Sequence, residues 1–256
     1  SGPVTIYHAL GNSLNIPIVR IINQMGGPEK LLKLYRQIGF DNLTKPSRNY
    51  GLSLAIGSGE VTLLDATNAF ATISQKGQHT NSIIYDNQEQ QETQQLFSAD
   101  SAYLVTSIIS DNSARTAAFG TRSNLRFPFP CAVKTGTSTD FRDNWCIGFT
   151  KDYTVGVWVG NLDNSPMRGI TGVSGAGPIF HAVMSELHKK NHPESFQTPP
   201  TITSIDIDPH TGKQLLPEHP RYHLAIRTFA SKTSAPPIAS TSDYDPKGRV
   251  YLNNTY

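Results

Sequence analysis

The sequence predicts an α/β fold of the α+β type, in which helices flank an antiparallel sheet and a small β-rich tail follows. Apolar residues recur at helical spacing in several segments before residue 115, and β-branched and aromatic residues fill 131–160. Beyond residue 191 the chain becomes rich in Pro, Ser and Thr. With 256 residues the chain is long enough to bury a sizeable core.

The composition excludes several functions. Charged residues make up 16% of the chain, and a net charge of +2 gives no indication of nucleic-acid binding. No apolar run approaches the roughly 18 residues that span a bilayer, and no signal peptide opens the sequence. The eight histidines are scattered, so we expect no metal and no other cofactor. Cys131 and Cys146 are expected to be buried free thiols, because a disulfide would need them in register.

The N-terminal part predicts helices that begin at prolines and end at glycines. Residues 1–12 form a helical approach, and helices follow over 17–25 and 28–38. Ser13 and Asn15 therefore lie at a helix entrance, with side chains free to point into a cleft. The alternative is that Asn15 only caps the following helix.

Two more helices are predicted in the middle of the chain. One begins at about Thr62, and another, capped by Ser98, runs to about Ser110. Gly57-Ser58-Gly59 lacks the Gly-Lys-Ser/Thr of a phosphate-binding loop, which excludes that function. Residues 88–95 are rich in Gln and Glu, which is typical of an exposed loop.

The block at 131–160 predicts three strands in an antiparallel meander. The first strand covers 131–137 and ends in a turn-forming run of Ser, Thr and Asp. Strands over 145–150 and 153–160 are separated by two residues only, which fits a tight hairpin.

The last third of the chain predicts a change of organisation. A glycine-rich loop covers 163–177, a helix begins at Pro178, and a Pro-containing linker leads to an alternating strand at 201–208. We therefore assign a main domain to 1–195 and a linker with a small β-rich extension to 196–256.

The first strand of the block carries the residues best suited to chemistry, Lys134, Thr135, Gly136 and Thr137. Because side chains alternate along a strand, Thr135 and Thr137 share one face and Lys134 points to the other. Gly136 lacks a side chain, so another backbone can lie alongside the strand. Two hydroxyls, a row of N–H groups and an ammonium suit a peptide that ends in a carboxylate.

Several stretches together resemble one known family. Lys-Thr-Gly followed by Thr at 134–137 is similar to the third of three motifs shared by penicillin-binding proteins and active-site-serine β-lactamases. Ser-x-Asn, the second motif, occurs at Ser13 and Asn15. The runs FPFPCAVKTGTS, FRDNWCIGFT and YTVGVWVGNLDNSPMRG resemble the transpeptidase domain of class A penicillin-binding proteins, most of all their 1C branch. The resemblance covers roughly residues 1–190.

The resemblance implies a peptidoglycan D,D-transpeptidase that works through a covalent acyl-enzyme. A serine attacks the penultimate D-Ala carbonyl of a stem peptide, and an amine of a neighbouring stem then takes the acyl group. Ser13 would relay the proton to the leaving amine, and Lys134 would polarise Ser13 and attract the substrate carboxylate. The Thr137 N–H would complete the oxyanion hole. The substrate-binding residues implied are Asn15, Thr135, Gly136 and Thr137.

The same resemblance implies partners and a location. The partners would be stem peptides of lipid II-derived glycan, β-lactam antibiotics as covalent inhibitors, and an upstream glycosyltransferase domain in the same polypeptide. The location would be the periplasmic side of the bacterial inner membrane.

The first family motif, Ser-x-x-Lys, is absent, since no lysine of this chain follows Ser or Thr by three residues. The nearest mimic, Cys131 to Lys134, lies on a predicted strand, where residues three apart face opposite sides. In the family this motif and two strands precede Ser-x-Asn. We therefore expect the nucleophile to lie outside this chain and the chain alone to be inactive, with 153–160 as an exposed edge strand.

Two other functions stay open at this point. A serine β-lactamase would need a deacylating base, and the length, the Trp-containing block and the tail argue against it. A non-catalytic remnant that binds cell wall or a partner is supported only by the missing motif, which an incomplete chain explains more simply.

Overall fold

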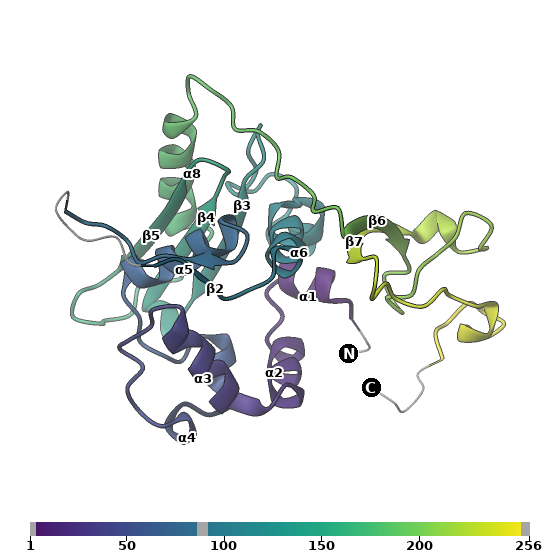
Figure 1. Ribbon diagram of the computed structural model, residues 1–256, viewed down its shortest axis with the longest axis horizontal. Coiled ribbons are helices and arrows are strands. Elements are labelled where there is room, and N and C mark those ends of the chain that lie inside the picture. The colour runs from purple at the N-terminus through teal and green to yellow at the C-terminus, as the bar shows by residue number, and fades with distance from the viewer. Residues whose placement is uncertain (1–3, 86–91, 252–256) are drawn as a thin grey trace.

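The central sheet has three antiparallel strands in the order β3-β4-β5 (Figure 1). The computed structural model describes residues 4–85 and 92–251, and its strands are β3 (Ala132–Thr137), β4 (Asp143–Phe149) and β5 (Thr154–Gly160). Val133 lies opposite Gly148, and the N–H of Thr150 donates to the Tyr153 carbonyl at 2.9 Å across the hairpin turn. The predicted meander and its tight hairpin are confirmed.

One face of the sheet packs against α8 (Ala176–Leu187), which begins two residues before the predicted Pro178. Phe180 and Met184 of this helix are fully buried. They belong to one apolar cluster with residues of β3, β4 and the preceding segment, which includes Val133 and the two unpaired thiols of Cys131 and Cys146.

The other face packs against α5 (Leu63–Ser74) and α6 (Ala99–Ser110). Both helices begin where the sequence predicts, because the hydroxyls of Thr62 and Ser98 accept hydrogen bonds from the N–H groups of the first turn. Ala132 and Phe149 lie in this second cluster. Lys134, two residues from Ala132, shares their face of the sheet, and Thr135 and Thr137 belong to the α8 face.

The N-terminal helices are α1 (Ile6–Gly11), α2 (Asn15–Gln24) and α3 (Gly27–Gln37). The predicted start of α2 at Pro17 is wrong by two residues, and Leu14 rather than Asn15 is its N-cap. Pro17 is tolerated because it lies in the first turn, where the N–H groups have no intrahelical acceptor.

Short elements complete this part of the chain: α4 (Ser47–Tyr50), α7 (Thr116–Phe119), and the strand pair β1 (Gln78–His79) and β2 (Gln94–Gln95). The loop predicted at 88–95 ends in β2, and its residues 88–91 lie outside the described ranges. No helix in those ranges is long and apolar enough to cross a membrane.

The tail forms a separate two-stranded sheet, β6 (Ile202–Ile207) with β7 (Ile226–Ser231), drawn in yellow-green beside α6 in Figure 1. Phe229 of β7 meets Tyr103 of α6 edge to face at 5.3 Å, and the Thr201 hydroxyl donates to Asp100 at 2.6 Å. The predicted β character of the tail is confirmed, and the boundary at 195/196 stays a prediction.

Gly148→Ala is expected to destabilise the chain by about 3 kcal/mol, because the core has no room for a side chain there. An added Cβ would lie 2.4 Å from the Ala132 oxygen and 2.8 Å from Cζ of Phe180. Gly177→Ala is the matched control, since its nearest neighbour would lie at 3.4 Å and alanine favours the helix. Urea unfolding of both variants checks this, and equal midpoints would contradict it.

Candidate active site

Ser13 and Lys134 are brought together by the fold, although 121 residues separate them. The Lys134 ammonium donates one hydrogen bond to the Ser13 Oγ and another to the Thr135 carbonyl, the latter at 2.9 Å. Ser13 has a φ of 57°, a left-handed conformation that is uncommon for residues other than glycine. A residue held in this way presents its hydroxyl in one direction, which favours a functional role.

The electrostatics at Lys134 are set mainly by burial. Removing the amine from water disfavours its charged form and lowers the pKa of Lys134 to about 8. Cys146 opposes this effect, and the Arg115 guanidinium, a smaller contribution than Cys146, adds to it. No carboxylate in the described ranges forms an ion pair with this ammonium. The amine therefore changes its charge close to neutral pH, as functional amines often do.

Asn12 positions the turn that carries Ser13, and no sequence pattern indicated it. The residue is 8% exposed, and its side chain donates to the Ala114 carbonyl at 2.8 Å and accepts from the Ala118 N–H at 2.9 Å. Gly11 allows this contact, because a Cβ there would lie 2.4 Å from the Ala114 oxygen. The turn is thus bound to the segment that precedes β3.

A loop from 161 to 175 runs along the other side of the same strand. The Gly172 N–H donates to the Thr137 Oγ1 at 2.9 Å, and a Cβ on Gly172 would lie 2.5 Å from the Gly136 oxygen. The sequence predicts that another backbone lies close to Gly136, and the loop at Gly172 does so. The residue that must lack a side chain is Gly172, because a Cβ at Gly136 itself would meet nothing nearer than 3.4 Å. The Thr137 hydroxyl keeps its own hydrogen available for another acceptor.

Asn15 lies at the first residue of α2 with its side chain exposed. It makes no capping hydrogen bond, so the capping alternative is not what the structure shows. It is two residues from Ser13, which places both at the same end of the helix.

Two other chemistries find no support among the described residues. Burial raises the pKa of the Cys131 thiol to about 12, which makes it a poor nucleophile. His188 and His192 are four apart, as are His219 and His223, yet no group of three or more His, Cys, Asp or Glu in the described ranges could hold a metal. Instead, the Nε2 of His188 lies 2.9 Å from the Thr150 Oγ1.

The chain matches the family model described as "Penicillin binding protein transpeptidase domain" over residues 1–185. It is 28% identical over 219 residues to penicillin-binding protein 1C of Escherichia coli, covering 85% of this chain and 27% of that protein. The chain spans about a third or less of the curated relatives that it matches.

Solved structures show the same fold. Penicillin-binding protein 1A of Haemophilus influenzae superposes with a TM-score of 0.71 at 19% identity, covering 92% of this chain and 41% of that one. PonA1 of Mycobacterium tuberculosis, determined in complex with penicillin V, gives a TM-score of 0.62 at 20% identity. The superposition covers 76% of this chain and 59% of that one.

Proposed function

This chain belongs to the penicillin-binding protein transpeptidase family, and from that we propose that it forms most of the transpeptidase domain of a bifunctional class A enzyme. The proposed reaction is acyl transfer from D-Ala-D-Ala stem peptides, which cross-links peptidoglycan. The contact between Lys134 and Ser13 carries the proposal, because it joins the second and third family motifs at one point.

In the proposed mechanism this chain's residues handle the proton and the substrate carboxylate. Ser13 protonates the leaving amine as the acyl-enzyme forms, and the Lys134 ammonium polarises its hydroxyl. The ammonium and the hydroxyls of Thr135 and Thr137 bind the terminal carboxylate. The Thr137 N–H stabilises the developing oxyanion, a contribution of typically about 3 kcal/mol per donor. Asn15 binds the substrate amide, and Gly136 leaves room for the peptide backbone.

In this proposal the acylated serine comes from sequence outside the 256 residues, because Ser-x-x-Lys does not occur within them. In the same proposal that sequence also supplies strands that pair with the edge strand β5 and an upstream glycosyltransferase domain. The assembled enzyme would act on lipid II-derived glycan at the periplasmic face of the inner membrane and be inhibited by β-lactams.

A fluorescent penicillin tests the proposal when it is applied to both the 256-residue chain and the product of the complete gene. We expect a covalent band on a denaturing gel for the complete product and none for the chain, since only the former has the nucleophile. A band for the chain alone would show a second nucleophile here and contradict this assignment. A complete product that stays unlabelled, though folded by circular dichroism, would reject the transpeptidase function.

The rate of acylation is expected to fall as pH rises through about 8. The pKa of Lys134 is lowered to about 8, so below this pH the amine is charged and attracts the carboxylate, and above it the attraction is lost. The second-order rate constant of the complete product with a penicillin, measured from about pH 6.5 to about pH 9.5, checks this, because the penicillin carboxylate stays ionised throughout.

A penicillin methyl ester is the matched control for the pH profile. It has no carboxylate, so its slower acylation should fall less near pH 8, because only the contribution of the ammonium to proton transfer is then lost. A fall of equal size for acid and ester would mean that attraction of the carboxylate has no part in the pH dependence.

A further inference from the structure

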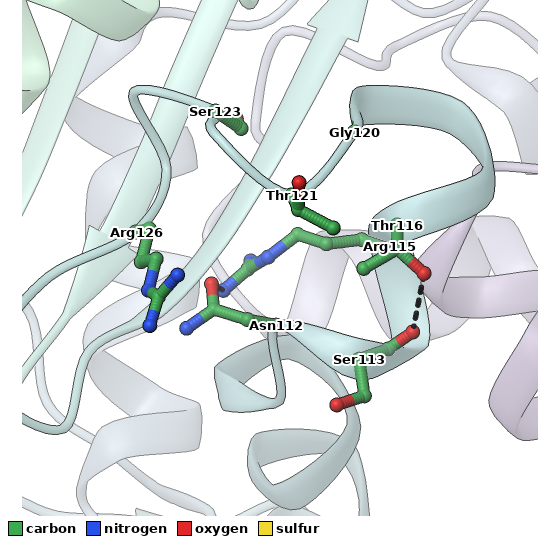
Figure 2. Close-up of a pocket in the computed structure, with 8 residues that line it drawn as sticks. All are labelled: Asn112, Ser113, Arg115, Thr116, Gly120, Thr121, Ser123 and Arg126. Carbon is green, nitrogen blue, oxygen red and sulfur yellow. Dashed lines mark hydrogen bonds between the residues drawn. The ribbon is translucent and has the colours of Figure 1, made fainter.

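A cavity of about 230 Å³ opens in the segment between α6 and β3. It takes no residue from the motifs described above, and the lining contains two arginines and no carboxylate (Figure 2). The lining residues are Asn112, Ser113, Arg115, Thr116, Gly120, Thr121, Ser123 and Arg126.

Arg115 is buried in this wall with only 5% of its surface exposed. Its Nη1 donates to the carbonyls of Ile109 and Val133 at 3.0 and 3.2 Å, and its Nη2 donates to the Asn112 Oδ1 at 3.0 Å. Its Nε is buried and has no hydrogen-bond partner. Burial also lowers the pKa of Arg115, and the negative charge of Asp111 only partly opposes this.

Among the described residues, Arg115 has no counter-ion in direct contact. No carboxylate in the described part of the chain forms an ion pair with it. The neighbouring Asp111 instead accepts from the Tyr7 hydroxyl at 2.5 Å and the Ser113 N–H at 2.7 Å. Buried charges in proteins are normally paired, so an anion is the group that this wall lacks.

Other donors face the same space. In Figure 2 the Arg115 and Arg126 side chains extend toward each other from opposite sides of the view, and the Asn112 amide lies between their guanidinium ends. Arg126 makes no side-chain hydrogen bond or ion pair with the described residues. Asn112 uses its oxygen for Arg115, which leaves its amide nitrogen as a donor.

We propose that this cavity binds a phosphate group, either as free inorganic phosphate or as the terminal group of a phosphate monoester. Arginine forks match phosphate oxygens in pairs, and the asparagine amide and the Thr121 hydroxyl add donors for the remaining oxygens. The volume lies below the roughly 300 Å³ at which pockets for drug-sized ligands begin, so it suits a small oxyanion. Through the Val133 carbonyl, Arg115 joins the site to the strand that carries Lys134.

Isothermal titration of the 256-residue chain with inorganic phosphate and with glycerol 3-phosphate tests the proposal. If both ligands bind with similar affinity, the site recognises the phosphate group alone. If the monoester binds clearly more tightly, the site also recognises the organic group that the phosphate is attached to. Either result supports the site. No binding of either ligand up to about 50 mM would overturn it.

Three variants locate the binding. Arg126→Ala removes an exposed donor that supports no other contact, and it should weaken binding by roughly tenfold or more. Asn112→Asp keeps the acceptor for Arg115 but adds a negative charge to the cavity, so binding should be lost. Arg122→Ala, an exposed arginine outside the lining, is the control and should change affinity by less than about twofold. An Arg126→Ala chain that binds phosphate as tightly as the Arg122→Ala chain would place the ion elsewhere and overturn the proposal.

Discussion

Lys134→Met is expected to slow acylation of the complete gene product by a penicillin by about 10²- to 10⁴-fold, the range for losing a positioned proton-transfer group. Methionine keeps the apolar stem and the approximate volume but removes the ammonium that donates to Ser13 and the Thr135 carbonyl. It also removes the charge that would attract the substrate carboxylate. Stopped-flow acylation with a chromogenic β-lactam measures the effect.

Stability separates this loss from unfolding. The pKa of Lys134 is lowered because the charged amine loses water on folding, and no carboxylate in the described ranges pairs with it. The unfolding midpoint of Lys134→Met should therefore stay the same or rise. Lys151→Met is the matched control, because Lys151 lies at the exposed turn of the same sheet and forms an ion pair with Glu194. Acylation of Lys134→Met within about threefold of the control would refute the role of this amine.

The elements of the fold that the sequence predicted correctly are those decided by local chemistry. The hydroxyls of Thr62 and Ser98 cap α5 and α6 as expected, and the two-residue connection closes the β4–β5 hairpin. The start of α2 was missed because Pro17 is compatible with several positions in a first turn. A proline indicates that a helix start is near but does not give its first residue.

The candidate site depends on contacts between distant segments, which no local pattern contains. Alternation along β3 predicted the opposite directions of Lys134 and Thr135, but only the family resemblance linked Lys134 to Ser13. Asn12 and Arg115 could not be found from the sequence. Asn12 is a single polar residue beside a glycine, and Arg115 becomes unusual only because tertiary packing buries it without a counter-ion.

Ser13→Gly is expected to slow acylation of the complete gene product by about 10²-fold or more, because the proton relay to the leaving nitrogen is lost. Ser13 has a φ of 57°, which glycine adopts without strain and alanine does not. Comparing Ser13→Gly with Ser13→Ala therefore separates the hydroxyl from the backbone. The two variants should acylate equally slowly, and the alanine variant should be less stable than the glycine variant by about 1–2 kcal/mol, because alanine, like the native serine, has a Cβ that is strained at this φ.

The double variant Ser13→Gly with Lys134→Met decides whether the two residues act as one unit. If the ammonium works by polarising the Ser13 hydroxyl, the double variant should be little slower than Lys134→Met alone, since each single change already breaks the relay. Fully multiplicative losses would mean that Lys134 acts only on the carboxylate and that its contact with Ser13 has no part in proton transfer. The same four proteins (the complete product, the two single variants and the double variant) can also be compared with the penicillin methyl ester, which lacks the carboxylate. This comparison isolates the contribution to proton transfer, and the coupling between Ser13 and Lys134 should be largest there.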